Sequence, residues 1–466
     1  MTRKSFIKTG SAAAAAAGFA GCMTANAGAG KLALLGGTPV MGKEFAKQKA
    51  DMFRWPIVND AMRKASDAVL RDCSMSGTGI TMEFEKKFAA WNGTKYALAC
   101  LNGTTALNTA FYAIGLKPGD EVICPSITMW ASCSGVVNIG ATVVFCDVNP
   151  EDLTIDPASF EARITPRTKA GVVVHYMGAP CDMDPIMKIA RKHGIKVVED
   201  VSHAQGGLYK GRKLGTIGDC GAMSLMTGKS FAIGEGGMFV TDDKELYRRV
   251  VRWGQYERIK RNFSAQEIVR TNNLPFGGVK NRINQCSAAI GIEQLKKYDA
   301  ECAVIEKAMR YYHDGIKDVK GIRMIYPEWE NSNKAGWYYS RANYMPEAFG
   351  GVNVKTFSKA LNAELSLSRY DGGCNFPLHT SSIFDDEDIF GNGNPTAKRY
   401  LPAGVTPKSL TGRLPVAESI LPRVIGDPSF KLFQKEKIDR YIEAVHKVAA
   451  NIDALRDWEK KNVKKA

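Results

Sequence analysis

Seven short apolar runs between residues 96 and 240 constrain the fold of this chain most strongly. They cover residues 96–100, 121–124, 142–146, 171–176, 196–199, 221–225 and 237–240. Amphipathic segments such as TALNTAFYAIG and MDPIMKIARKHG lie between several of them. Strands that alternate with helices are typical of a doubly wound α/β fold. The sequence therefore predicts a largely parallel sheet, whose ligand lies outside the carboxyl ends of the strands.

Polar residues follow at least five of these runs, where such a sheet would place them along one edge. These residues are Asn102-Gly103-Thr104, Ser126, His175, Asp200, His203, Ser224 and Lys229. A single polar residue at a strand end is unremarkable, because a helix cap or an ion pair explains it. Five strand ends that bring polar groups to one edge are instead typical of a binding site.

Asp200 and Lys229 indicate the chemistry of that site. Lys229 lies in the glycine-rich, uncharged stretch SLMTGKSFAIGEGG, where a solvated surface lysine is less natural. A partly buried, neutral lysine attacks aldehydes to form a Schiff base, and it moves protons once it is released. Asp200, at the end of KVVED, would pair with a cofactor ring nitrogen as a carboxylate. This pair suggests pyridoxal phosphate, whereas a helix cap and a surface lysine are the simpler alternatives.

Three further features fit such a cofactor. NGTTAL places Gly103, Thr104 and Thr105 at the start of a helix, where backbone N–H groups bind a phosphate. The alternative is an ordinary helix that Thr104 caps. Trp130 in PSITMWAS is a candidate for stacking on a flat ring, or else a core aromatic residue. His203 could reach a phenolic oxygen, and no spacing predicts a metal site.

The composition excludes several other classes of protein. The formal net charge is +15, but the basic residues are scattered among acidic ones, so a nucleic-acid partner is not expected. The eleven cysteines are irregularly spaced and lie mostly in apolar runs. They read as small buried hydrophobic residues rather than as a disulfide framework.

The N-terminus differs from the rest of the chain. TRKSFIKTG, an alanine run and GFAGC together resemble an export signal of the twin-arginine type, with lysine at the second arginine position. FAGC resembles a lipoprotein cleavage box, so Cys22 could carry a lipid that makes the only membrane contact. We expect export to the periplasm or cell envelope. The alternative is an alanine-rich tail on a cytoplasmic protein.

The predicted organisation has three parts. Residues 1–30 are the export signal and a linker, 31–318 a large cofactor-binding domain, and 319–466 a smaller C-terminal α/β domain. The stretch RINQCSAAIGIEQLKKYDAECAVIEKAMRYYHDGIKD predicts one long connecting helix within the large domain. KIDRYIEAVHKVAANIDALRDW predicts one amphipathic helix at the C-terminus.

The chain resembles the DegT/DnrJ/StrS-type sugar aminotransferases, which are pyridoxal phosphate enzymes of fold type I. The resemblance runs from LALLGGTPV to DRYIEAVHKV. It is strongest in NGTTAL, KPGDEVICPSITMWA, VEDVSHAQG, KGRKLGTIGD, SLMTGK, IGEGG and AAIGIEQLKK. It implies a large domain with a mainly parallel seven-stranded sheet and a smaller C-terminal α/β domain. It also implies a homodimer with active sites at the subunit interface.

The resemblance gives each motif residue a role. Lys229 matches the Schiff-base lysine, Asp200 the partner of the pyridinium nitrogen, and His203 a residue near the phenolic oxygen. The phosphate cup is matched by Gly103, Thr104 and Ser224, and the aromatic residue that stacks on the ring is matched by Trp130.

A second segment departs from the family pattern. GGVKNRINQ has Lys280 where the family usually donates an asparagine to the partner's phosphate, and Arg282 matches the family arginine. Together with His379 in NFPLHTSSIF, these residues resemble the branch that acts on keto-cyclitols and some keto-sugars. His379 and Arg282 are therefore candidate substrate residues, and a structural loop role is the alternative for His379.

The function implied is amino transfer from glutamate or glutamine to a keto-sugar or keto-cyclitol. A sugar dehydratase of the same family is an alternative, but that branch has histidine in place of Lys229. A cysteine desulfurase would need a loop cysteine beside the site, and no good candidate is present. A non-catalytic, envelope-anchored binding or regulatory protein that retains the fold is the remaining alternative.

Overall fold

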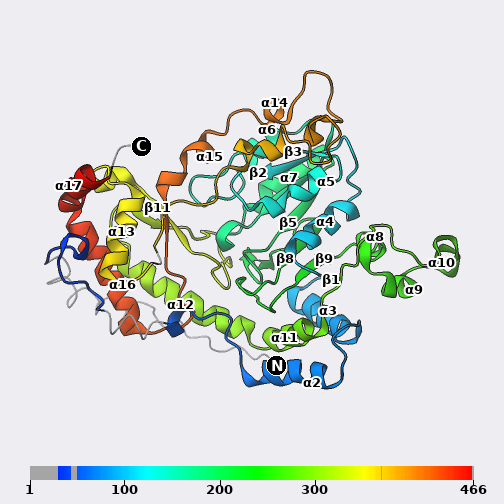
Figure 1. The fold of residues 1–466 in the computed structure, drawn as a ribbon, viewed down its shortest axis with the longest axis horizontal. Helices are drawn as coiled ribbons and strands as arrows, with labels where there is room; N and C mark the ends of the chain where they lie inside the picture. Colours follow the sequence, from blue (N-terminus) through cyan, green and yellow to red (C-terminus); the bar gives the residue numbers. More distant parts are fainter. Residues whose placement is uncertain (1–29, 43–49, 369, 464–466) are drawn as a thin grey trace, which may run out of the picture.

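The computed structural model of the protein describes residues 30–42, 50–368 and 370–463. Its main sheet has seven strands in the order β1-β9-β8-β5-β4-β2-β3 (Figure 1). The seven strands are β1 (Tyr96–Cys100), β2 (Glu121–Pro125), β3 (Thr142–Cys146), β4 (Thr168–Val174), β5 (Lys196–Asp200), β8 (Cys220–Ser224) and β9 (Gly237–Thr241). Each strand overlaps one of the predicted runs. Strand β9 runs in the direction opposite to the other six strands, which are parallel to one another. The predicted, mainly parallel α/β fold is confirmed.

Helices cover both faces of this sheet because its strands are apolar on both sides. One face packs against α4 (Gly103–Ala113), α5 (Ser134–Asn138) and α8 (Lys244–Gly254). The other face packs against α3 (Gly79–Asn92), α6 (Pro157–Ala162), α7 (Met183–His193) and α11 (Gln285–Leu295). Alternate residues of a strand enter the two cores, as Leu98 and Ala99 of β1 do.

A third core lies in the C-terminal part of the chain, at the left of Figure 1. It contains the antiparallel sheet β10-β11-β12, which consists of Ile322–Met324, Arg341–Tyr344 and Val424–Gly426. The helices around it are α12 (Tyr298–Ile316), α13 (Val354–Glu364), α16 (Lys435–Ala450) and α17 (Ile452–Asn462). The other α-helices described are α2 (Asp60–Arg71), α9 (Ile259–Asn262), α10 (Ala265–Thr271), α14 (Pro407–Thr411) and α15 (Pro415–Ser419). The other β-strands described are β6 (Leu208–Tyr209) and β7 (Arg212–Lys213).

Two predicted helices are each divided in the structure. The predicted connecting helix is α11 followed by α12, because Lys297 leaves the helical region at φ −123°. The predicted C-terminal helix is α16 followed by α17, with Asn451 at φ −107° between them. In both places apolar residues keep the helical spacing across the break, so the pattern did not reveal it.

Packing crosses the predicted domain boundary at residue 318 in two segments. Leu32 and Met41 belong to the C-terminal core, where Glu364 accepts hydrogen bonds from the N–H groups of Ala33 and Val40. In the other direction, Leu378, Phe384, Leu414, Ala417 and Ile420 belong to the core of the main sheet. The boundaries themselves stay a prediction.

Within the described residues, no helix is both long and apolar enough to cross a bilayer. The ten cysteines described are free thiols, and six of them are buried. The cysteines predicted to be small buried residues, Cys100, Cys124, Cys146 and Cys220, are among those six. The predicted export signal and Cys22 lie outside the described residues.

Candidate active site

A cavity of about 260 Å³ opens at the carboxyl ends of the parallel strands. Its walls combine the N-terminus of α4, the segment after β2, the end of β5 and the loop after β8. The lining residues are Asn102, Gly103, Thr104, Leu107, Thr128, Met129, Ala131, Ser132, Val174, Asp200, Ser202, His203, Ser224, Met226, Lys229, Glu235 and Tyr338. Six of the predicted site residues therefore meet in one cavity: Gly103, Thr104, Asp200, His203, Ser224 and Lys229.

Asp200 is a fixed hydrogen-bond acceptor at the end of β5. Its side chain is nearly buried, with 4% of the residue exposed. The Ser132 hydroxyl donates to Oδ2 at 2.7 Å, and the Ser202 backbone N–H donates to Oδ1 at 3.0 Å. Ser132 is in turn 2.8 Å from the Thr128 hydroxyl. These two hydrogen bonds fix the orientation of the Asp200 side chain, which as a carboxylate would pair with a protonated ring nitrogen.

Lys229 is similarly buried, with 4% of the residue exposed, in the loop between β8 and β9. Its backbone is held on both sides: its N–H donates to the Met226 carbonyl at 2.8 Å, and its carbonyl accepts from Trp55 Nε1 at 2.8 Å. Burial lowers the pKa of the Lys229 amine to about 8, although the charge of Asp200 opposes this shift. The neutral, nucleophilic fraction of the amine near neutral pH is therefore larger than in an ordinary lysine.

His203 also lines the cavity and is a neutral hydrogen-bond donor. Burial, and then the charge of Lys229, hold its pKa well below the ordinary histidine value. Its Nδ1 accepts from the Met177 N–H at 3.3 Å, which leaves the proton on Nε2. Its ring stacks on Tyr338, with centroids 4.5 Å apart and an interplanar angle of 28°. Nε2 can thus donate to an oxygen of a bound molecule.

The N-terminus of α4 provides an anion site. Asn102 and Thr105 form a capping box, with the Thr105 N–H donating to Asn102 Oδ1 at 2.9 Å. The Gly103 and Thr104 N–H groups remain available at the positive end of the helix dipole. Gly103 has to be glycine, because a Cβ there would lie 2.6 Å from Ser224 Cβ. The Thr105 hydroxyl is bonded to the Asn102 backbone in this capping box, and Thr105 is not among the lining residues, so its predicted contact with the cofactor stays a prediction.

The predicted stacking role of Trp130 stays a prediction, and the position of this residue in the single chain does not support it. Trp130 starts the short 3₁₀-helix η3 (Trp130–Ser132), is 51% exposed and does not line the cavity. Met129, one residue earlier, has an extended backbone and lines the cavity. Because the 3₁₀-helix begins between these two residues, Met129 lines the cavity and Trp130 does not.

Lys280 and Arg282 lie outside the cavity of their own chain. Lys280 is exposed near Tyr256, with Nζ 5.8 Å from the ring centroid. Arg282 pairs with Glu257 and donates to the Ser76 hydroxyl at 2.9 Å. The prediction that Lys280 reaches the phosphate bound to a partner subunit stays a prediction, as does a substrate role for Arg282 in that subunit.

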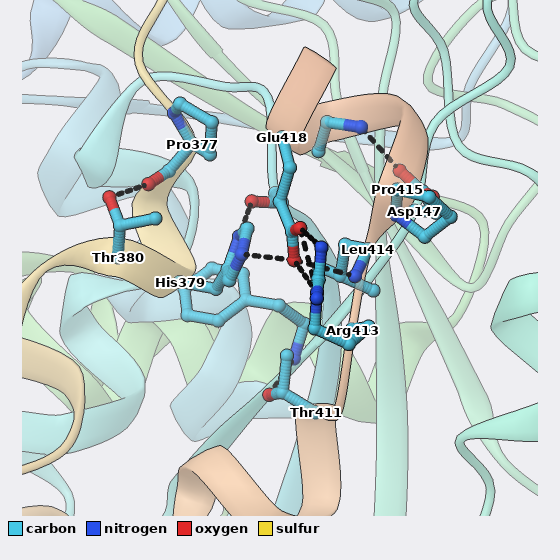
Figure 2. A network of polar contacts seen from close by, with 12 residues as sticks. Asp147, Pro377, His379, Thr380, Thr411, Arg413, Leu414, Pro415 and Glu418 are labelled. Carbon is cyan, nitrogen blue, oxygen red and sulfur yellow. Dashed lines mark hydrogen bonds and ion pairs between the residues drawn. The ribbon is translucent and has the colours of Figure 1, made fainter.

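His379 belongs to a network of polar contacts around Glu418 (Figure 2), and it is not among the residues that line the cavity. Its Nδ1 is 2.7 Å from the Ser126 hydroxyl, and its Nε2 is 3.6 Å from a carboxylate oxygen of Glu418. Glu418 also accepts from Arg413 and from the Leu414 N–H. These contacts join α15 and the two residues before it, through His379, to Ser126 directly after β2. They fit the structural alternative for His379, and its role as a substrate contact stays a prediction.

Several cavity residues were not predicted from the sequence. The motifs PSITMWAS, VEDVSHAQG and IGEGG contain Ser132, Ser202 and Glu235, so the position of each residue within its motif was the available signal. Tyr338 comes from the C-terminal part, more than one hundred residues after Lys229 in the chain, and no local pattern marked it.

Comparison with known proteins identifies the family. Residues 57–446 match the DegT/DnrJ/EryC1/StrS aminotransferase family. The protein belongs to this family. It is therefore an aminotransferase, and pyridoxal phosphate is its cofactor.

Individual relatives agree with this membership. The chain is 32% identical to the L-glutamine:2-deoxy-scyllo-inosose aminotransferase of Streptoalloteichus tenebrarius over 411 residues, which cover 84% of this chain and 91% of that enzyme. It is 43% identical to the GDP-perosamine synthase of Caulobacter vibrioides over 235 residues, only half of this chain and 61% of that enzyme. A crystal structure of an aminotransferase from Psychrobacter cryohalolentis, 30% identical, covers 86% of this chain and 99% of that one with a TM-score of 0.71.

The cavity fits pyridoxal phosphate. Gly103 packs directly against Ser224, so the first N–H groups of α4 and the Ser224 side chain line one wall of the cavity, where they could hold the phosphate. Asp200 offers a carboxylate for the ring nitrogen, and Lys229 offers a buried amine for the aldehyde. The donor set therefore matches each polar group of the cofactor.

Proposed function

We propose that this enzyme transfers the amino group of glutamate or glutamine to a keto-sugar or keto-cyclitol. The observation that carries the proposal is the meeting of Lys229 and Asp200 in one cavity, on a fold shared with aminotransferases. The extended similarity to an L-glutamine:2-deoxy-scyllo-inosose aminotransferase supports this class of donor and acceptor. The similarity to GDP-perosamine synthase supports a sugar, although it covers only half of the chain.

Each polar group of the cavity has a task in this reaction. Bound pyridoxal phosphate supplies an electron-accepting ring that stabilises negative charge at the carbon that bears the amino group. Asp200, fixed by Ser132 and Ser202, would hold the ring nitrogen in its protonated form. The Lys229 amine would hold the cofactor at its aldehyde carbon, and as a free amine it would take up a proton at one reacting carbon and return it at the other. His203 Nε2 would donate to the phenolic oxygen, and the N-terminus of α4 would hold the phosphate.

Separate half-reactions test the proposal. Protein loaded with pyridoxal phosphate is incubated with glutamine or glutamate, and the visible spectrum and the keto-acid product are followed. Candidate keto-cyclitols and keto-sugars are then added to the amino form, and recovery of the original spectrum identifies the acceptor. Lys229→Met should abolish both half-reactions. Unchanged turnover in Lys229→Met would refute the assignment of the lysine.

We further propose a homodimer in which Lys280 of each chain approaches the phosphate site of the other. The segment from α9 to residue 280 projects from the main sheet, at the right of Figure 1. It exposes Val269, Leu274, Phe276 and Val279, of which Leu274 and Phe276 are 61% and 57% exposed. Contiguous apolar side chains on a projecting segment are typical of a protein interface. A lysine could bind the phosphate there as a point charge.

We also propose that the protein is exported, with Cys22 as a possible site of lipid attachment. The support is the sequence TRKSFIKTG followed by an alanine run and GFAGC. Cell fractionation with the intact signal and with Arg3→Gln/Lys4→Gln tests the idea. Export of the first protein and retention of the second would support it. A cytoplasmic protein that keeps its complete N-terminus would favour the alternative location.

A further inference from the structure

A strained arch, residues 334–340, brings Tyr338 from the C-terminal part of the chain into the active site. Three of its non-glycine residues have positive φ angles: Ala335 at 49°, Trp337 at 48° and Tyr339 at 44°. L-residues rarely adopt this conformation, and it persists only where the surroundings hold it. The arch therefore needs contacts that fix its backbone.

The arch lies directly against the catalytic lysine. The Tyr338 ring centroid is 4.2 Å from Lys229 Nζ. The same ring stacks on His203 and meets the Tyr339 ring edge-on, with those two centroids 4.6 Å apart. Gly336 packs so closely on the residue after Lys229 that a Cβ would lie 2.6 Å from Ser230 Cβ. Tyr338 thus covers the Lys229 amine and also supports the ring of His203.

A second lysine holds the backbone of the arch. Lys431 Nζ donates to the carbonyls of Gly336 at 2.9 Å and Trp337 at 3.3 Å, and to Ser429 Oγ at 3.0 Å. Ser429 Oγ itself donates to the Trp337 carbonyl at 2.6 Å. In the described part of the chain, the polar partners of the Lys431 side chain are thus two carbonyls and a hydroxyl, with no carboxylate among them. A charged donor forms stronger hydrogen bonds than a neutral one, which suits it to holding a strained backbone.

Lys431 is also linked to Lys229 through Trp55. Lys431 Nζ lies 5.3 Å from the centroid of the Trp55 ring. Trp55 Nε1 donates to the Lys229 carbonyl, and the Lys431 N–H donates to the Met52 carbonyl at 2.7 Å. Lys431 thus joins the arch and the segment around Trp55, which together enclose Lys229.

We propose that Lys431 is a positioning residue of the active site, which fixes the 334–340 arch so that Tyr338 shields the Lys229 amine and supports His203. The proposal goes beyond the amino-transfer reaction, because it concerns how this chain prepares its lysine whatever the acceptor. Without Lys431 the arch relaxes toward unstrained backbone angles, and water reaches Lys229.

This relaxation has a defined effect on Lys229. The titratable groups that face its amine are Asp200, His203, Tyr338 and Glu235. Burial lowers the pKa of Lys229 to about 8, and the Asp200 charge acts in the opposite direction. When the Tyr338 ring moves away, burial decreases while Asp200 remains. The pKa therefore rises toward the ordinary value of 10.5.

The experiment measures that pKa in the full-length protein without cofactor, so its outcome does not depend on transamination. The protein is labelled with trace acetic anhydride from pH 6 to 11, and the Lys229 peptide is quantified by mass spectrometry. For Lys431→Met we expect the labelling midpoint to rise by about one pH unit. Lys213→Met is the matched control, because Lys213 also donates to a carbonyl and lies over a tryptophan ring, but outside the cavity.

A double-mutant cycle separates positioning from a general loss of stability. Tyr338→Ala should raise the midpoint by a similar amount, and Lys431→Met/Tyr338→Ala should raise it no further. Additive shifts, or a Lys431→Met protein with an unchanged midpoint, would overturn the proposal. If Lys431→Met does not fold, Ser429→Ala removes only the hydroxyl. It should give a smaller shift in the same direction, and an unchanged midpoint there would also overturn the proposal.

Discussion

The hydroxyl of Ser132 donates a 2.7 Å hydrogen bond to Oδ2 of Asp200, a residue 68 positions later in the chain. The pair connects the segment after β2 with the end of β5, two strands that are separated in the sheet by β4. With the Ser202 N–H on Oδ1, both oxygens of the carboxylate have a donor. The orientation of the cofactor's ring-nitrogen partner therefore depends on a residue that is not itself charged.

Ser132→Ala should weaken pyridoxal phosphate binding without unfolding the protein. A hydrogen bond to a charged group contributes about 1.5–3 kcal/mol, which corresponds to roughly a 10- to 100-fold loss of affinity. Equilibrium dialysis of the cofactor measures the effect. Thr154→Ala is the control, because it removes a similar 2.8 Å hydroxyl bond to Asp152 away from the cavity. Equal affinities in the Ser132 variant and the native protein would contradict this role.

Asp200→Asn should lower the pKa of Lys229 below its value of about 8. The Asp200 charge favours the protonated amine, so its removal leaves the effect of burial unopposed. A lower pKa means a larger neutral fraction, so Lys229 of the cofactor-free variant should be labelled faster at pH 7. The pH midpoint of labelling measures the shift. Asp219→Asn, which removes a carboxylate bonded to Lys196, should leave the midpoint in place, and a rise in Asp200→Asn would show the sign to be wrong.

Gly103→Ala should impair both stability and phosphate binding. The new methyl group would lie 2.6 Å from Ser224 Cβ and 2.8 Å from Ser224 Cα, so the N-terminus of α4 must move away from β8. Overpacking of this kind typically costs about 1–3 kcal/mol. Urea unfolding and cofactor titration measure the two effects. Gly42→Ala meets no atom within 4 Å and should match the native protein. Normal cofactor affinity in Gly103→Ala would exclude the proposed phosphate site.

Leu274→Asp/Phe276→Asp should convert the proposed dimer into monomers. Both side chains are exposed in the single chain, so the substitutions should leave its fold intact while charges oppose their burial at an interface. Sedimentation velocity measures the mass, and amino transfer should fall with the dimer because Lys280 no longer reaches its partner. Val463→Asp alters an exposed apolar residue elsewhere and serves as the control. An undiminished dimer would place the interface on another surface.

The local pattern was sufficient for the main sheet and for the edge at which the cavity lies. Each predicted run overlaps a strand, because runs buried on both faces are apolar throughout and are separated by turn residues. Parallel strands bring their carboxyl ends to one edge, so Asp200, His203 and Lys229 meet there. The helix breaks near Lys297 and Asn451 were missed because apolar spacing continues across them.

The sequence alone determined the fold class, the family and the residues whose chemistry is local to a motif: the lysine, the aspartate and the phosphate-binding turn. Only the tertiary structure decided which neighbours complete them. Met129 lines the cavity and Trp130 does not, because the 3₁₀-helix begins at Trp130. His379 contacts Glu418 and is not among the residues that line the cavity. Tyr338 covers Lys229 because a strained arch, more than one hundred residues away in sequence, is held there by Lys431. Contacts between distant segments depend on the packing of the whole chain, so no local periodicity records them.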